Sequence, residues 1–302
     1  MNVRLIGVKM DLGAGLRGVD MGPTALRIAG IQREIQKLNH TVEDIGDIEV
    51  SSAQTAKVDD ESARYKVEIV KTCTALAAVV DQTKKEGTFP LVMGGDHSIA
   101  MGTISGLASY YKSQGKKFGV VWVDAHADMN TPDTSPSGNI HGMPLSACLG
   151  MGPKELTHIY DVGQKLDPDN VFLIGIREID ASEKKAVNSS GVNAYTMEDI
   201  DRLGIYQTMV EVREAIQAKG LDAIHVSFDV DGLDPSVAPG VGTPVPGGLT
   251  YREANLLVEM LFETGKIGSL ELTEINPILD NCNQTAEVAL KIALSALGKT
   301  IL

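Results

Sequence analysis

Residues Val121–Asn130 read V-W-V-D-A-H-A-D-M-N. Three apolar residues, typical of a buried strand, run directly into Asp124, His126 and Asp128, which are spaced two apart. In an extended backbone successive side chains alternate faces, so these three are expected to point the same way. Unpartnered carboxylates and an imidazole at the end of a buried strand are costly, whereas a bound cation stabilises them. The stretch therefore predicts part of a metal site.

Strand-like apolar runs recur along the whole chain, at Val3–Val8, Phe89–Met93, Val120–Asp124, Val171–Gly175, Ile224–Asp229 and Ser269–Ile275. Helical spacing fills the stretches between them: a helix opened by Pro23, then Glu61–Glu86, Ile99–Gln114, Ala254–Glu263 behind a capping box at Thr250–Glu253, and Asn283–Leu297. This alternation predicts an α/β fold, a three-layer sandwich with a mostly parallel central sheet flanked by helices. Without repeats or long linkers, residues 1–302 are expected to form a single domain.

The composition excludes several classes of partner. Of the 302 residues, 43% are hydrophobic and 22% charged, and the net charge of -13 argues against nucleic acid and anionic membranes. No apolar run approaches the roughly 18–20 residues of a membrane span, and the N-terminus lacks the apolar core of a signal peptide. Cys73, Cys148 and Cys282 lack C-x-x-C spacing and are expected to be reduced core thiols. Together these features predict a cytoplasmic protein whose charge serves solubility.

Polar residues follow four of the predicted strands, in the segments M-G-G-D-H-S at 93–98, 124–130, D-V-D-G-L-D-P at 229–235 and E-I-N-P at 274–277. Ligands of open parallel sheets bind beyond the carboxyl ends of the strands, near a topological switch point. Each segment alone could be ordinary turn chemistry or a solvated loop. Because all four belong to the same edge of the sheet, they are expected to meet there.

The segments supply more ligands than one ion needs, namely His97, Asp124, His126, Asp128, Asp229 and Asp231. Two ions that share bridging aspartates are the natural solution. Mostly oxygen ligands with some imidazole and no thiolate favour Mn²⁺ over structural zinc. A water between the ions would become a hydroxide nucleophile near neutral pH. With Glu274 the pocket is net negative, which favours a cationic substrate and counts against a phosphatase.

These segments resemble the signatures of the arginase/agmatinase (ureohydrolase) family: G-G-D-H-S at 94–98, D-A-H-A-D at 124–128, S-F-D-V-D-G-L-D-P at 227–235 and E-I-N-P at 274–277. The resemblance extends over nearly the whole chain, from G-V-D-M-G-P at 18–23 to the C-terminal helix. It implies a three-layer fold, two Mn²⁺ per chain, and hydrolysis of a guanidinium group to an amine plus urea. It further implies one ion held by His97, Asp124, Asp128 and Asp229, and another held by Asp124, His126, Asp229 and Asp231.

The substrate is predicted from two further segments. The loop N-T-P-D-T-S-P-S-G-N-I-H-G at 130–142 is similar to the amino-acid recognition loop of the arginase subgroup, which implies that Asn130, Ser137 and Asn139 contact an α-carboxylate. On composition alone it could be an ordinary surface loop. The segment at 176–183 resembles the one whose Asp contacts the α-amino group, here Asp180, with Glu183 assisting through water. Its charges also allow a solvated helix start.

The same resemblance implies roles for four more side chains. His141 corresponds to the proton shuttle, and a pKa near neutrality would suit delivery of a proton to the departing amine. Glu274 would pair with the guanidinium and hold its carbon against the hydroxide, which Asp128 would orient. Thr243, in G-V-G-T-P-V-P-G-G, corresponds to a threonine of the guanidinium pocket.

Some residues match no family motif or depart from it. His40, His158 and His225 match none and are expected to be structural. Glu271 stands where the family more often has an apolar residue, and strand alternation places it opposite Glu274, so we expect it at the surface or an interface. The short C-terminus resembles bacterial family members, which implies a homotrimer or homohexamer. The apolar face of the C-terminal helix would suit either subunit packing or the core.

The sequence thus predicts a binuclear manganese hydrolase that converts L-arginine to L-ornithine and urea. The same chemistry on another guanidino compound, such as agmatine or guanidinobutyrate, is the nearest alternative. A non-catalytic metal-binding regulator is disfavoured, since all ligands, His141 and Glu274 are present. A single-zinc deacylase of related fold is disfavoured because it would not need both His97 and the second aspartate of D-x-D.

Overall fold

One eight-stranded sheet runs through the centre of the chain, in the computed structural model that describes residues 1–160 and 163–302. The strand order is β2-β1-β3-β8-β7-β4-β5-β6, and every neighbouring pair is parallel. The strands are β1 (Asn2–Val8), β2 (Thr41–Ile48), β3 (Phe89–Met93), β4 (Phe118–Val123), β5 (Val171–Ile176), β6 (Asn193–Thr196), β7 (Ala223–Asp229) and β8 (Ile267–Thr273).

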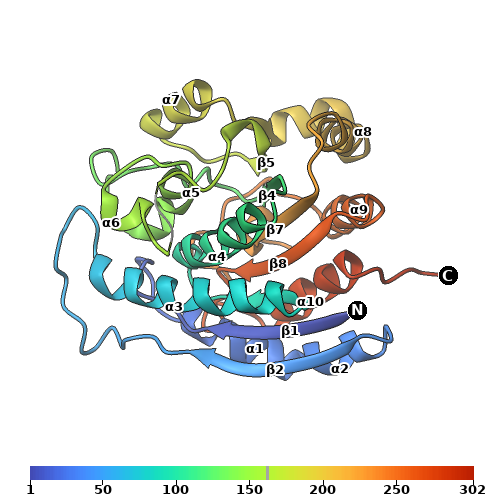
Figure 1. Cartoon of the computed structure of the whole chain (residues 1–302), viewed down its shortest axis with the longest axis horizontal. Helices are drawn as coiled ribbons and strands as arrows, with labels where there is room; N and C mark the ends of the chain where they lie inside the picture. Colours follow the sequence, from blue (N-terminus) through green and yellow to red (C-terminus); the bar gives the residue numbers. More distant parts are fainter. Residues whose placement is uncertain (161–162) are drawn as a thin grey trace.

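Helices cover both faces of this sheet, as Figure 1 shows with α3 and α4 in front of the strands. The longer helices are α1 (Gly22–Ala29), α3 (Lys66–Lys85), α4 (Ala100–Ser113), α7 (Ala181–Ser190), α8 (Met197–Ala218), α9 (Tyr251–Phe262) and α10 (Gln284–Ala296). Shorter ones are α2 (Ile31–Gln36), α5 (Pro144–Cys148) and α6 (Lys154–Thr157), with single 3₁₀ turns at Val19–Met21, His97–Ile99, Ile140–Gly142, Pro168–Asn170 and Val230–Gly232. The predicted three-layer α/β sandwich is confirmed.

Strand alternation divides the apolar side chains between two cores. Val121 and Val123 of β4 face a core built with α1, α2, α8, α9 and α10, while Val120 and Trp122 face a core built with α3, α4, α5 and α6. Both faces of a parallel sheet are therefore buried, which explains why the central strands read as continuous apolar runs. The apolar face of α10 belongs to the first core, with Ala289, Ile292 and Ala293 fully buried.

All six predicted strands are present, but the sequence did not reveal the two edge strands. β2 alternates between exposed and half-buried residues, and β6 is only four residues long and half-buried throughout. Edge strands lack the apolar runs that identify central ones. The helix expected from Glu61 begins at Lys66, after Tyr65 adopts a left-handed conformation with φ 57°.

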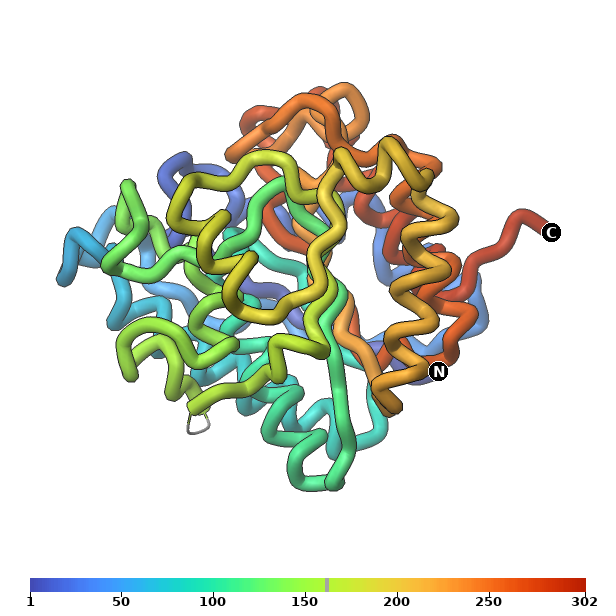
Figure 2. The backbone as a smooth tube through the Cα atoms, turned by 90° about the horizontal axis from the view of Figure 1, so that it is seen from above, coloured from blue at the N-terminus to red at the C-terminus, as the bar shows by residue number. Residues whose placement is uncertain are grey.

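The chain ends lie on the same side of the molecule, and the last residues extend away from its body (Figure 2). Among the described residues, no helix combines the length and the apolar character needed to cross a lipid bilayer.

Replacement of Gly106 tests the close packing of α3 on α4. A Cβ atom there would lie 2.4 Å from the carbonyl oxygen of Ala77 in α3. Gly106→Ala is therefore expected to lower the free energy of unfolding by about 1–3 kcal/mol, as overpacked substitutions do. Helix propensity alone predicts the opposite sign, a gain of about 0.5–1 kcal/mol. Urea denaturation distinguishes the two, and stabilisation would contradict the packing argument.

Candidate active site

The four strands that carry the predicted motifs are neighbours at the centre of the sheet, in the order β3-β8-β7-β4. Their carboxyl ends therefore lie side by side, although the residues they carry are far apart in sequence. The expectation that the four segments meet at one edge of the sheet is confirmed. Parallel pairing is what brings them together, because it places every carboxyl end at the same edge.

The path of the chain after β4 differs from the extended backbone expected from D-A-H-A-D. The strand ends at Val123, bends follow at Ala125 and His126, and Asp128 adopts a left-handed conformation with φ 52°. The carbonyl of Asp128 accepts hydrogen bonds from the backbone N–H groups of Leu145 (3.1 Å) and Ser146 (3.3 Å). The three polar side chains still converge, but a bent loop rather than strand alternation directs them, so that part of the prediction was wrong.

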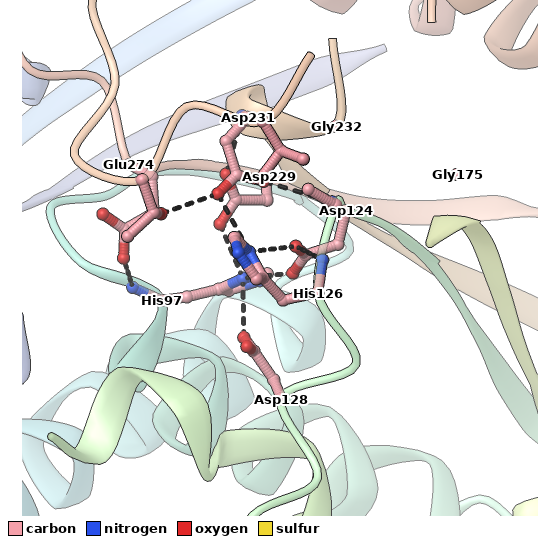
Figure 3. Close-up of polar contacts among 12 residues, drawn as sticks. His97, Asp124, His126, Asp128, Gly175, Asp229, Asp231, Gly232 and Glu274 are labelled. Atoms are coloured by element: carbon pink, nitrogen blue, oxygen red, sulfur yellow. Dashed lines mark hydrogen bonds and ion pairs between the residues drawn. The ribbon is translucent and has the colours of Figure 1, made fainter. Parts of the chain in front are cut away.

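The imidazole of His97 lies at the centre of one group of carboxylates (Figure 3). Its Nδ1 is 3.2 Å from Asp124 Oδ2, 3.2 Å from Asp128 Oδ2 and 3.0 Å from Asp229 Oδ2. This buried nitrogen has no hydrogen-bond partner among the described residues. The ring stacks on Trp122, whose Nε1–H donates to Asp124 Oδ2 over 2.9 Å.

A second group adjoins the first and shares Asp124 with it. His126 Nδ1 is 3.4 Å from Asp124 Oδ1 and 3.2 Å from Asp231 Oδ2. In each group one ligand atom per residue lies within 4.8 Å of the others, the groups being His97, Asp124 and Asp229, and Asp124, His126 and Asp231. Two adjacent groups with a common carboxylate suit two cations better than one.

The electrostatics of both groups favour added positive charge. Burial would lower the pKa of His97, but the nearby carboxylates of Asp124, Asp128 and Asp229 raise it well above its usual value. Burial acts the same way on His126, yet Asp124 and Asp231 raise the pKa of His126 to about 12. Burial and the charge of Asp124 raise the pKa of Asp128 to about 7. Carboxylates that raise the pKa of neighbouring histidines in this way also attract divalent cations.

Glu274 stands beside the metal groups and is paired with His141. Its Oε1 accepts from the backbone N–H of His97 (2.9 Å) and lies 3.0 Å from His141 Nδ1. Its other oxygen, Oε2, is buried without a hydrogen-bond partner among the described residues. Glu274 also has a left-handed backbone, with φ 64°. The carboxylate therefore has one oxygen fixed by the protein and one available to a ligand.

Glu274 and His141 carry opposite charges. Burial would raise the pKa of Glu274, but the charge and hydrogen bond of His141 keep it below its usual value. Burial would lower the pKa of His141, but Glu274 raises it to about 9. His141 therefore carries its proton at neutral pH, and its pKa is higher than the near-neutral value we expected from the sequence.

One cavity joins these groups to the predicted substrate residues. Its empty volume, which includes the open mouth, is about 580 Å³. Every predicted site residue except the deeply buried Asp124 lines it, namely His97, His126, Asp128, Asn130, Ser137, Asn139, His141, Asp180, Glu183, Asp229, Asp231, Thr243 and Glu274. The structure thus brings all the candidates to one place, while their roles remain predictions.

Asp180 has two structural partners as well as a place in the cavity wall. Its Oδ1 accepts from the backbone N–H groups of Ser182 (2.7 Å) and Glu183 (2.9 Å), which makes it the N-cap of α7 in a capping box. Its Oδ2 accepts from Asn130 Nδ2 over 2.8 Å. Glu183 accepts from the N–H of Met129 over 3.2 Å. The helix start and the predicted substrate contacts, treated as alternatives from sequence, therefore fall on the same residues.

Thr243 and Arg177 hold the segment around Asp231, which lines the cavity. Thr243 Oγ1 donates to Asp231 Oδ2 over 2.9 Å. The guanidinium of Arg177 donates to the carbonyls of Asp231 (2.7 Å) and Val245 (2.8 Å), among others. We did not single out Arg177 from the sequence. Its position directly after β5, at the same edge as the motifs, was the available signal.

The surface or interface position expected for Glu271 is wrong. Its side chain is fully buried beside Ser227 and His225, because the face opposite the first core is covered by helices rather than solvent. The core position expected for Cys282 is also wrong, since it is exposed, whereas Cys73 and Cys148 are buried as expected.

Comparisons with known proteins agree with this geometry. The family model described as "Arginase family" matches residues 1–298. The chain is 48% identical to an arginase of Bacillus caldovelox and 45% identical to one of Bacillus subtilis, over 99% of each chain. A crystal structure of arginase from Bacillus cereus superposes with a TM-score of 0.94 at 44% identity, over 100% of both chains. On these matches, the chain belongs to the arginase family.

Proposed function

We propose that this protein hydrolyses the guanidinium group of L-arginine, giving L-ornithine and urea. The observation that carries the proposal is one cavity with three distinct regions. Two adjoining His/Asp groups form one region, and the Glu274–His141 pair beside them forms the second. The third region holds Asn130 and Asp180, whose polar side chains could contact the amino and carboxylate groups of an amino acid. Each region matches one part of the reaction: activation of water, capture of the guanidinium, and recognition of the amino-acid end.

The residues present fit two Mn²⁺ ions. The unpartnered Nδ1 of buried His97 faces three carboxylates and is an orphan that a cation would satisfy. We propose one ion at His97, Asp124, Asp128 and Asp229, and another at Asp124, His126, Asp229 and Asp231. Oxygen and imidazole donors without thiolate support manganese. When bound, such ions lower the pKa of a coordinated water and supply a nucleophile at neutral pH.

Glu274 positions the guanidinium. Its buried Oε2 lacks a partner, and a buried carboxylate oxygen without a hydrogen bond is costly. A guanidinium N–H would satisfy it and would add an opposite charge to the acidic pocket. Because the backbone N–H of His97 fixes the other oxygen, the substrate is held in one orientation relative to the two His/Asp groups.

His141 is suited to protonate the departing amine. It is charged at neutral pH, and its Nδ1 is bound to Glu274. Its other ring nitrogen has no hydrogen-bond partner among the described residues and can serve the cavity that His141 lines. Cleavage of the bond between the guanidinium carbon and its substituted nitrogen needs a proton on that nitrogen, because a neutral amine leaves more readily than its anion. Asp128 would orient the attacking oxygen.

Neutral donors and one carboxylate define the amino-acid end. Asn130, Ser137 and Asn139 would bind the α-carboxylate, and Asp180 the α-amino group, with Glu183 assisting through water. Thr243 would line the guanidinium pocket beside Asp231. Agmatine lacks the carboxylate that the neutral donors would bind, and guanidinobutyrate lacks the α-amino group that Asp180 would bind. These contacts therefore favour arginine over agmatine and guanidinobutyrate, which remain the alternative substrates.

We also propose that residues 1–302 act as one catalytic domain, in the cytoplasm, as a homotrimer or homohexamer. One continuous sheet carries all the site residues or the loops that hold them. The apolar face of α10 is used by the core, so it does not support the oligomer. Ile278 and Leu279 expose 64% and 47% of their surface near the E-I-N-P segment and offer apolar contacts instead.

Urea release tests the proposed function directly. The chain, loaded with Mn²⁺, is expected to release urea from L-arginine with a kcat/KM at least about tenfold higher than from agmatine, which corresponds to about 1.4 kcal/mol of transition-state binding. Removal of the metal by a chelator should abolish activity, and added Mn²⁺ should restore it. A preference for agmatine would refute the carboxylate contacts while leaving the metal chemistry, and no urea from either would refute the proposal.

Two substitutions of Asp180 separate its capping role from its role in the cavity. Asn is as good an N-cap as Asp, so Asp180→Asn should raise the KM for arginine about 10-fold or more while leaving stability nearly unchanged. Asp180→Ala should raise KM and also cost about 1 kcal/mol of unfolding free energy. Steady-state kinetics and thermal denaturation measure the two effects. An unchanged KM in Asp180→Asn would remove Asp180 from the substrate site.

The pKa of His141 depends on Glu274 and can be measured without metal. Glu274 raises this pKa to about 9, whereas burial by itself lowers it. In Glu274→Gln the pKa of His141 is therefore expected to fall, so that the ring loses its proton at a lower pH than in the parent chain. Histidine NMR of the metal-free proteins follows the titration. An equal or higher pKa in the variant would contradict the assigned pairing.

A further inference from the structure

A line of buried polar side chains leads from His97 away from the cavity and into the sheet. His97 Nε2 lies 2.8 Å from Ser227 Oγ, and Ser227 Oγ donates to Glu271 Oε1 over 2.6 Å. His225 Nε2 is 3.3 Å from the same Glu271 oxygen, and His225 Nδ1 is 2.9 Å from Ser269 Oγ. None of these side chains is more than 1% exposed.

The register of β7 and β8 brings these side chains together. In the β7–β8 pair, Ser227 is opposite Glu271 and His225 is opposite Ser269. Directly opposite side chains on one face of a sheet are close neighbours. The alternate residues Val226 and Leu270 face the first core, so the polar residues share the other face. A buried carboxylate among them is costly unless it is well paired, and structural packing alone would be served by apolar residues.

Counting protons along the line shows that Nε2 of His97 carries a proton, so Nδ1 is the nitrogen that is bare when the ring is neutral. An ionised carboxylate only accepts, so the single hydroxyl proton of Ser227 goes to Glu271. The oxygen of Ser227 must then accept from His97, which places a proton on Nε2. In the neutral imidazole Nδ1 is then unprotonated, and its lone pair faces Asp124, Asp128 and Asp229. This is the tautomer that can bind a cation in the cavity.

Glu271 decides in which direction the hydrogen bonds of this line are donated. Its Oε1 lies 2.6 Å from Ser227 Oγ and 3.3 Å from His225 Nε2. Burial would raise the pKa of Glu271, but His225 and the hydrogen bond from Ser227 keep it below its usual value, so the carboxylate accepts and does not donate. Without an obligate acceptor at this position, Ser227 could donate to His97 Nε2 instead. The imidazole proton would then be on Nδ1, where it would oppose a cation.

We propose that Glu271, supported by His225, holds His97 through Ser227 in its metal-binding tautomer and thereby strengthens binding of the ion nearest His97. The arrangement is a carboxylate–histidine–metal relay with a serine inserted between carboxylate and histidine. Glu271, Ser227 and His225 are positioning residues, since they do not line the cavity. The proposal rests on the two-ion function proposed above, and it concerns only one of the two ions.

Metal titration of the stripped protein tests the proposal with Glu271→Gln. The glutamine amide can donate to Ser227 and so permits the wrong tautomer. By analogy with other partners of metal-bound histidines, one ion is expected to bind about 10–100-fold more weakly, while the ion at His126 and Asp231 binds as before. Calorimetry gives the two affinities, and electron paramagnetic resonance reports loss of the coupled manganese pair at limiting metal.

Two other variants keep the test independent of folding. Ser227→Ala removes the link without changing a buried charge and should weaken the same ion. Asp81→Asn is the matched control: Asp81 is a buried carboxylate of α3, paired with Lys85 (2.7 Å) and Tyr160 (2.9 Å), and it does not line the cavity. It should leave both affinities unchanged, whatever it does to the melting temperature.

The outcomes separate this proposal from the proposed function. Selective loss of one ion in Glu271→Gln and Ser227→Ala supports the relay. Parental affinity for both ions in these variants, or equal weakening of both ions in step with the melting temperature, overturns it. If the unmodified chain itself binds fewer than two ions or releases no urea from arginine, it is the proposed function that fails.

Discussion

The constraint on which the site depends is the repulsion among buried carboxylates at the end of four adjacent strands. Asp124, Asp128, Asp229, Asp231 and Glu274 are each at most 6% exposed, and like charges so close cannot all stay ionised without positive partners. The fold supplies some of these partners as imidazoles and as the half-buried guanidinium of Arg177. The proposed metal ions and cationic substrate would supply the rest, which would give the stability of the site and its function the same electrostatic origin.

The same constraint explains why the metal-site histidine His97 has polar partners inside the sheet, on the side away from the cavity. A carboxylate-rich site needs imidazoles that present a lone pair to a metal, and their other nitrogen must be satisfied inside the sheet. For His97 this support comes from Ser227 and Glu271 on two neighbouring strands. Trp122 adds a stacked ring and a hydrogen bond to Asp124. The buried polar residues of β7 and β8 are thus part of the proposed support of the site, although they do not line the cavity.

Several residues serve structure and site together. Asp180 caps α7 and forms part of the cavity wall. Asp128 and Glu274 adopt left-handed backbones, which are unfavourable for residues other than glycine and persist where the surroundings impose them. Backbone hydrogen bonds from Leu145 and Ser146 to Asp128, and from Glu274 to Gly95, hold these conformations. These hydrogen bonds place the side chains of Asp128 and Glu274 in the cavity wall.

The sequence by itself determined the layered parallel fold and the set of residues at its central edge, because apolar runs mark buried strands and the polar motifs follow them directly. It did not determine the bend at Asp128, the use of Asp180 as a cap, or the place of Glu271. Alternation indicates which face of a strand a side chain takes, but only tertiary structure decides whether that face meets water or helices. In this sheet both faces are covered, and a carboxylate that alternation assigned to the surface instead lies buried behind His97.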